Sequence, residues 1–162
     1  MFSKKGDEWE TPLSLYRRLD DIYHFTGDAC CTTENKKHDN HHTKEQDAIT
    51  RDWFTVTFCN PPYSNIRGFV KKAYDESLSG KIIIVLIPAR TDTRYFHEYC
   101  MKASELIFIT GRLQFDNRTL PSWKADGTHK RSSAPFPSIV VVFDEKRRNK
   151  RGFVVVSEMG WK

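Results

Sequence analysis

A continuous apolar run at residues 82–87 constrains the fold of this chain more than any other feature. The run Ile-Ile-Ile-Val-Leu-Ile has no polar face, which is typical of a parallel strand covered on both sides. Further strands are predicted at residues 25–30, 55–59, 105–110, 138–143 and 152–156, and helices at residues 11–23, 65–78 and 93–103. This alternation predicts an α/β fold with a Rossmann-like, mixed and mostly parallel sheet, and helices on both faces.

The composition limits the size, compartment and partners of the protein. A chain of 162 residues suits a single domain spanning residues 1–162. The net charge of +5 and the pI of about 9.0 favour a polyanionic partner such as DNA. No run approaches the ~20 apolar residues needed to cross a membrane. Four cysteines without a C-x-x-C pair, and no signal peptide, indicate a cytoplasmic protein with reduced thiols.

Asn60-Pro61-Pro62-Tyr63 directly follows the predicted strand at residues 55–59. Two consecutive prolines remove two backbone N–H donors and fix two φ angles, so the strand must end there in a stiff loop. Open α/β sheets bind their ligands in loops at the carboxyl ends of strands. The tetrapeptide therefore predicts a ligand site, although a plain Asn-Pro turn is the alternative.

The residue types of this loop suit a planar base with an exocyclic amine. The lone pair of such an amine is delocalised into the ring, so its nitrogen must become tetrahedral before it attacks a methyl group. Two acceptors aimed at its hydrogens, the Asn60 side-chain oxygen and the Pro61 carbonyl, would stabilise that change. Tyr63 offers a face on which the base can stack.

The tetrapeptide resembles the catalytic motif of amino-group methyltransferases that use S-adenosylmethionine. More of the chain is similar to small phage-type DNA N6-adenine methyltransferases, and the similar segments follow the order of that family: residues 7–12, 28–30, 60–64, 88–93, 111–115 and 135–138. The resemblance implies methyl transfer from S-adenosylmethionine to N6 of adenine in DNA. The target base would be flipped out of the duplex, because N6 cannot reach the cofactor while the base is stacked.

The resemblance also implies six cofactor-binding residues: Trp9, Thr11, Pro12, Asp28, Glu34 and Asp47. The segment at Trp9 would close over the methionine end of the cofactor, near the unpaired N–H groups of a helix beginning at Thr11. Asp28 would meet the cationic end, Glu34 the ribose and Asp47 the adenine ring. From the residues alone, Thr11 is an N-cap and Asp28 a loop-capping residue. The segment after Asp28 departs from the family pattern because it lacks a glycine-rich stretch.

Four residues are assigned to DNA contact: Arg90, Arg112, Trp123 and Lys124. Arg90 follows the most buried strand and is expected to face the same crevice as Asn60. Arginine there would hold a DNA phosphate or the cofactor carboxylate, with a surface salt bridge as the alternative. Residues 116–137 have no clear period and are predicted to form a loop that faces DNA.

Two other clusters are interpreted as structural. His38, His41 and His42 lie near Cys30 and Cys31 in the sequence, but the spacing matches no common zinc pattern, so no metal is expected. The basic run at residues 147–151 separates two predicted strands. It is interpreted as the solvated turn of an antiparallel hairpin at one edge of the sheet, rather than a nucleic-acid patch.

Three alternatives to adenine methylation remain open from the sequence. Cytosine N4 and the side chain of a protein glutamine are amines that enzymes with the same tetrapeptide also methylate. The glycine-poor cofactor segment leaves a third alternative, a DNA-binding module that has kept the fold and lost catalysis.

Overall fold

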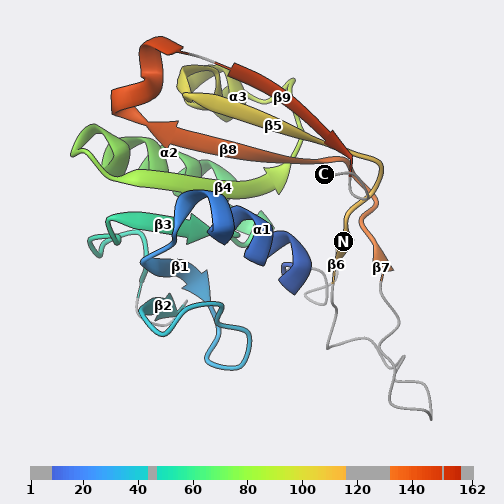
Figure 1. The fold of residues 1–162 in the computed structure, drawn as a ribbon, viewed down its shortest axis with the longest axis horizontal. Helices are drawn as coiled ribbons and strands as arrows, with labels where there is room; N and C mark the ends of the chain where they lie inside the picture. The colour runs from blue at the N-terminus through green and yellow to red at the C-terminus, as the bar shows by residue number, and fades with distance from the viewer. Residues whose placement is uncertain (1–8, 44–46, 116–131, 151, 158–162) are drawn as a thin grey trace.

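The computed structural model describes residues 9–43, 47–115, 132–150 and 152–157 (Figure 1). Seven strands form one sheet: β1 (Gly27–Cys31), β2 (His41–Thr43), β3 (Val56–Cys59), β4 (Ile82–Pro88), β5 (Glu105–Thr110), β8 (Ser138–Asp144) and β9 (Gly152–Ser157). Their order is β2-β1-β3-β4-β8-β5-β9. Within this sheet only β8 runs against its neighbours, so the predicted mixed and mostly parallel α/β sheet is confirmed.

The predicted antiparallel hairpin at the sheet edge is wrong. β8 pairs with β4 on one side and β5 on the other, and β9 pairs with β5 in parallel at the edge. The physical reason lies in β8 itself, because all seven of its residues are buried and alternate aliphatic side chains enter both cores. A strand apolar on both sides belongs in the middle of a sheet. The charged segment after it forms a 3-10 helix, η4 (Glu145–Lys150), instead of a hairpin turn.

Helices cover both faces of the sheet, as predicted. Helix α1 (Leu13–Tyr23) packs on one face, and α2 (Ile66–Leu78) and α3 (Arg94–Glu98) lie on the other (Figure 1). The core on the α1 side includes Phe58, Ile84 and Leu86, whereas the α2 side takes the alternating Ile83 and Val85. Each side of the sheet therefore has its own apolar layer, as period-2 alternation requires.

Helix α1 begins later than the sequence indicates. Its N-cap is Pro12, with no side-chain cap, and not Thr11. Leu13 and Ile22, expected on the apolar face, are 45% and 52% exposed. The described part of the chain contains no helix long and apolar enough to cross a bilayer.

Two short pieces escaped the sequence prediction. Residues 41–43, where no strand is predicted, form β2, which pairs in parallel with β1 at the edge of the sheet. Strands β6 (Gln114–Phe115) and β7 (Ser132–Ser133) pair in an antiparallel ribbon, so the predicted loop at 116–137 is wrong for β7. Residues 116–131 lie outside the described residues.

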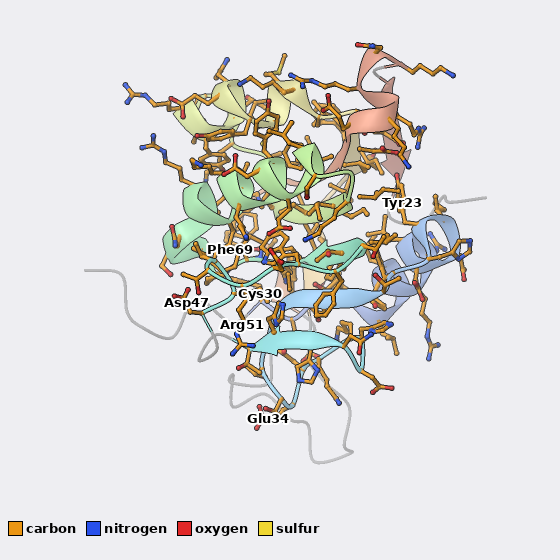
Figure 2. All side chains as sticks on the ribbon, turned by 90° about the vertical axis from the view of Figure 1, so that its left-hand side faces the viewer. Tyr23, Cys30, Glu34, Asp47, Arg51 and Phe69 are labelled. Atoms are coloured by element: carbon orange, nitrogen blue, oxygen red, sulfur yellow. The ribbon has the colours of Figure 1, made fainter. Side chains whose placement is uncertain are left out.

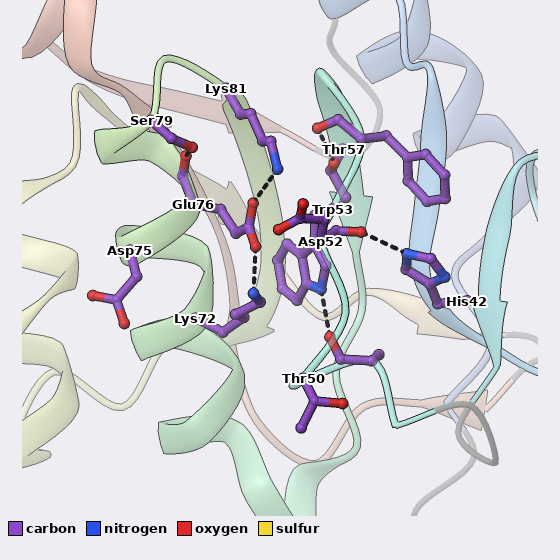
Figure 3. Close-up of polar contacts among 12 residues, drawn as sticks. His42, Thr50, Asp52, Trp53, Thr57, Lys72, Asp75, Glu76, Ser79 and Lys81 are labelled. Carbon is purple, nitrogen blue, oxygen red and sulfur yellow. Dashed lines mark hydrogen bonds and ion pairs between the residues drawn. The ribbon is translucent and has the colours of Figure 1, made fainter.

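Glu76 ties α2 to the amino end of β4. Its carboxylate lies between the ammonium groups of Lys72 and Lys81 (Figure 3). Burial alone would raise the pKa of Glu76, but the hydrogen bonds from both lysines outweigh it and lower that pKa. Nearby, the Trp53 indole donates to the Ala48 carbonyl at 2.7 Å and seats the loop before β3 against the same side of the sheet.

Candidate active site

The Asn-Pro-Pro-Tyr loop connects β3 to α2, at the end of the sheet where the parallel strands have their carboxyl ends. Pro62 is extended, with φ −62° and ψ 135°, and its carbonyl accepts from the Asn65 backbone N–H at 3.0 Å. The Asn65 side chain in turn accepts from the Gly68 N–H at 3.2 Å and caps α2. The loop is therefore fixed at both ends, by β3 before it and by a capped helix after it.

The Asn60 side chain faces the segment that precedes α1. Its amide nitrogen donates to the Trp9 carbonyl at 2.6 Å and to the Thr11 hydroxyl at 2.9 Å. Within the described residues, nothing donates to the Asn60 Oδ1 or to the Pro61 carbonyl. The two oxygens that the sequence analysis singled out as acceptors are thus both unused by the protein.

One pocket gathers seven of the predicted residues: Trp9, Thr11, Asp28, Asn60, Pro61, Pro62 and Tyr63. They come from three places in the sequence: the segment before α1, strand β1, and the loop after β3. Residues 60–63 follow β3, and Asp28 lies on β1, where it pairs with Phe58 of β3. Parallel pairing of β1 with β3 brings Asp28 beside the loop, and the hydrogen bonds from Asn60 hold the segment before α1 against it.

Asp28 is buried within β1 and is 2% exposed, so it is not the loop residue that the sequence analysis expected. Its carboxylate accepts from the backbone N–H groups of Cys30 and Lys37, each at 3.2 Å. Burial raises the pKa of Asp28, while these hydrogen bonds and the positive charge of Lys37 act in the opposite direction. Burial has the larger effect, so the pKa of this pocket carboxyl is raised overall.

Lys37 and Glu10 form an ion pair at the pocket wall. The lysine nitrogen lies 2.7 Å from a Glu10 carboxylate oxygen, and both side chains are only 10% exposed. Sequence reasoning missed both residues, because a single lysine in a polar loop carries no period or motif. Four more lining residues escaped it as functional candidates: Cys30, Cys31, Asn35 and Phe58.

Tyr63 belongs to an aromatic cluster beside the pocket. Its ring stacks on Trp9 with centroids 6.4 Å apart and meets Phe136 edge-on at 5.2 Å. Trp9 also contacts Phe115 of β6 edge-on at 5.5 Å. Burial raises the pKa of Tyr63, and the positive charge of Arg90 opposes that rise. The phenol stays neutral at physiological pH.

The remaining predicted residues do not line this pocket. Pro12 is buried as the α1 N-cap, and exposed Glu34 points outward from the loop between β1 and β2 (Figure 2). Asp47, with φ 50°, is exposed between β2 and β3. Arg90 and Arg112 are exposed after β4 and β5, respectively. Trp123 and Lys124 lie outside the described residues.

The Cys31 thiol donates to the His42 carbonyl at 3.6 Å, but the imidazole rings of His41 and His42 contact other carbonyls. All four cysteines are buried thiols. The ring of His42 contacts the Asp52 carbonyl at 2.9 Å (Figure 3), and that of His41 contacts the Asp39 carbonyl at 2.7 Å. Among residues 9–43, 47–115, 132–150 and 152–157, no three His, Cys, Asp or Glu side chains are grouped to hold a metal ion.

Comparison with known proteins gives consistent results. Residues 1–160 match the family model described as DNA N-6-adenine-methyltransferase (Dam). The chain is 31% identical over 152 residues to the DNA N-6-adenine-methyltransferase of Haemophilus phage HP1 (strain HP1c1), covering 89% of this chain and 83% of the relative. It is 33% identical over 113 residues to the DNA N-6-adenine-methyltransferase of Escherichia phage T1, covering 68% of this chain and 48% of that relative. The match thus spans about half the length of the T1 protein.

Proposed function

The chain belongs to the DNA N-6-adenine-methyltransferase family, and from this premise we propose that it takes the methyl group from S-adenosylmethionine and holds the flipped adenine against residues 60–63. Membership makes it an enzyme, an adenine-specific DNA methyltransferase. The observation that carries the proposal is the pocket in which two unused acceptors, of Asn60 and Pro61, share a wall with a buried acid, Asp28.

The charged groups of the pocket suit S-adenosylmethionine, which supplies an electrophilic methyl group when bound. The cofactor carries an ammonium, a sulfonium and a carboxylate. The buried Asp28 carboxylate is stabilised by a cation placed beside it, and a neighbouring Lys37 ammonium suits a carboxylate. We place the methionine end of the cofactor here, between β1 and the segment at residues 9–11. Glu34 and Asp47 stay predictions for its other end.

The acceptors of the loop bind and orient the N6 amine of the adenine. N6 has two hydrogens, and the Asn60 Oδ1 and the Pro61 carbonyl accept one each. As the nitrogen becomes tetrahedral, its lone pair forms the new N–C bond, the C–S bond breaks with both electrons left on sulfur, and one N–H proton goes to solvent. The acceptors stabilise the positive charge that develops on nitrogen, so they act most strongly in the transition state.

Entry of the base requires that it leave the duplex. Asn60 is half-buried and Pro61 is buried, so a stacked and paired adenine cannot bring N6 to their oxygens. Tyr63 supplies the face that replaces the lost stacking. Arg90, exposed after β4, contacts the phosphate of the flipped nucleotide, and Arg112 a neighbouring one. The whole chain, residues 1–162, acts as one domain on DNA.

The test is product analysis. Plasmid DNA is incubated with the protein and S-adenosylmethionine carrying a deuterated methyl group, digested to nucleosides and analysed by mass spectrometry. The expected product is labelled N6-methyldeoxyadenosine, which Asn60→Ala forms far more slowly than the parent. Labelled N4-methyldeoxycytidine instead, or label on protein, would contradict the proposed substrate. Product formed only with another methyl donor would contradict the proposed cofactor.

A further inference from the structure

The Asn60 amide is held by two acceptors that no catalytic role accounts for. Its nitrogen has two hydrogens, and the Trp9 carbonyl at 2.6 Å and the Thr11 hydroxyl at 2.9 Å accept them. Thr11 is only 2% exposed. Because Thr11 does not cap α1, its hydroxyl is available for this contact.

The direction of the amide follows from the chemistry of these partners. A backbone carbonyl only accepts hydrogen bonds, so the atom of Asn60 that faces Trp9 must be the nitrogen. The opposite rotamer would bring two oxygens to 2.6 Å, with no hydrogen between them. The Asn60 Oδ1 therefore points away from residues 9–11, and within the described part of the chain nothing donates to it.

We infer that the Trp9 carbonyl and the Thr11 hydroxyl are positioning groups that fix the Asn60 amide with its oxygen presented to the target amine. This inference rests on the proposed function and adds a reason for asparagine at position 60. An aspartate would offer an equally good acceptor to N6. It has no hydrogen for Trp9, however, so its second oxygen would face the carbonyl in direct repulsion.

The acceptors themselves are held in place on both sides. Glu10, between them in sequence, pairs with Lys37 in the pocket wall, and the Trp9 ring packs on Tyr63 and Phe115. The segment cannot shift without breaking a largely buried ion pair and the aromatic contacts. Such fixed partners are what a preorganised catalytic group requires.

The first experiment compares Thr11→Val with Thr11→Ser and with Thr57→Val. Thr57 is the matched control: it is also buried, and its hydroxyl donates to the Phe54 carbonyl at 2.7 Å without touching Asn60. Thr11→Val is expected to lower kcat roughly five- to tenfold, the range for one lost hydrogen bond. KM for DNA stays near the parent value, and kcat is measured at saturating S-adenosylmethionine because Thr11 also lines the proposed cofactor pocket. Thr11→Ser restores kcat, and Thr57→Val lowers Tm without lowering kcat. Parental kcat in Thr11→Val, or no rescue by serine, would overturn the inference.

Asn60→Asp separates positioning from simple hydrogen-bond acceptance. If position 60 needed only an acceptor, aspartate would keep most of the activity. The contact with Trp9 instead predicts a loss as large as that of Asn60→Ala at neutral pH. Aspartate with the parental kcat would contradict a positioning role for Trp9.

NMR of the free protein tests the orientation without any methyl transfer. In the ¹⁵N-labelled parent, both side-chain amide protons of Asn60 are expected to exchange slowly with solvent, with a nuclear Overhauser effect to the Thr11 methyl group. In Thr11→Val, exchange of the side-chain amide becomes faster. Fast exchange of both protons in the parent would overturn the inference and leave the proposed function standing. A parent protein that makes no N6-methyldeoxyadenosine would instead overturn the proposed function, whatever the NMR result.

Discussion

The two ends of the central strands, called here the amino edge and the carboxyl edge of the sheet, differ in how their positive side chains are paired. At the amino ends of β4 and β5, three cations face carboxylates: Lys81 with Glu76, Arg147 with Glu105 at 3.8 Å, and Arg148 with Glu145 at 3.2 Å. At the carboxyl edge, Arg90 and Arg112 are exposed and form no ion pair with another described residue. The two arginines of the basic run that the structure describes are therefore partly neutralised by carboxylates, whereas Arg90 and Arg112 are not.

The same contrast holds for hydrogen bonding. At the amino edge, polar side chains such as Glu76 are engaged by the protein itself (Figure 3). At the carboxyl edge, Asn60 and Pro61 keep an oxygen each without a donor in the described residues. Hydrogen-bond acceptors without a donor, at the carboxyl end of a strand, indicate a ligand site better than the number of charged residues does.

Removal of an unused acceptor is expected to have the largest effect. Asn60→Ala should lower the methylation rate about 100- to 1,000-fold, as loss of a preorganised polar contact does in other enzymes. The matched control is Asn65→Ala, five positions later, which removes the α2 cap and costs about 1 kcal/mol of stability without changing the rate per folded molecule. Steady-state methylation and urea denaturation measure the two effects. Equal methylation rates for the parent and Asn60→Ala would show that the unused acceptor at the carboxyl edge has no role in catalysis.

Loss of the stacking ring should be next in size. Tyr63→Ala is expected to lower kcat/KM about 10- to 100-fold, because stacking is worth about 1–3 kcal/mol per base. Tyr63→Phe should keep most of the activity, since the raised pKa keeps the phenol neutral and the face alone is used. Tyr74→Ala removes a ring of the other edge, beside Arg148, and leaves kcat/KM per folded molecule unchanged. A large loss in Tyr63→Phe would assign the role to the hydroxyl instead.

A pair of arginines tests the charges directly. Arg90→Gln is expected to weaken DNA binding and to reduce the slope of log K against log salt by about 1, as loss of one phosphate contact does. Arg147→Gln, at the paired edge, should leave that slope unchanged. Fluorescence anisotropy of labelled duplex DNA over a salt series measures both. A reduced slope for Arg147→Gln, with an unchanged slope for Arg90→Gln, would place DNA at the amino edge instead.

The smallest effect on activity is expected at Glu76. Its pKa is lowered in the folded protein from the ordinary 4.5, so its ionised form stabilises the fold at neutral pH. That contribution is lost as the pH falls below 4.5 and through the folded pKa. The difference in urea midpoint between the parent and Glu76→Gln should therefore be greatest near pH 7 and shrink in acid. Methylation at pH 7 should not change, and a midpoint difference that grows in acid would contradict the pKa direction.

The sequence predicts strands well where one physical signal decides the structure. The apolar run at 82–87 and the two prolines after Cys59 place β4 and the end of β3 within a residue or two. It misses β2, because three residues of polar sequence have no period, and only pairing with β1 makes them a strand. The position of β8 is also a tertiary property. Its apolar sequence indicates burial, but not which strands lie beside it.

The site was partly predictable for the same reason. Asn60, Pro61 and Tyr63 are marked by a contiguous motif, and strand direction alone brings Asp28 close to them. Lys37 and Glu10 have no local mark, since their pairing joins two loops far apart in the sequence. Thr11 was found for the wrong reason, because its hydroxyl serves Asn60 and not the helix that follows it.

The place of β8 has a consequence for how the chain is made. It is the eighth strand to leave the ribosome, yet it pairs with both β4 and β5, which are made before it. At translation rates of about 5–20 residues per second, β4 waits about 2–10 s for its partner. During that interval the nascent protein already carries residues 60–63, while one side of β4 offers unpaired backbone groups to any passing strand.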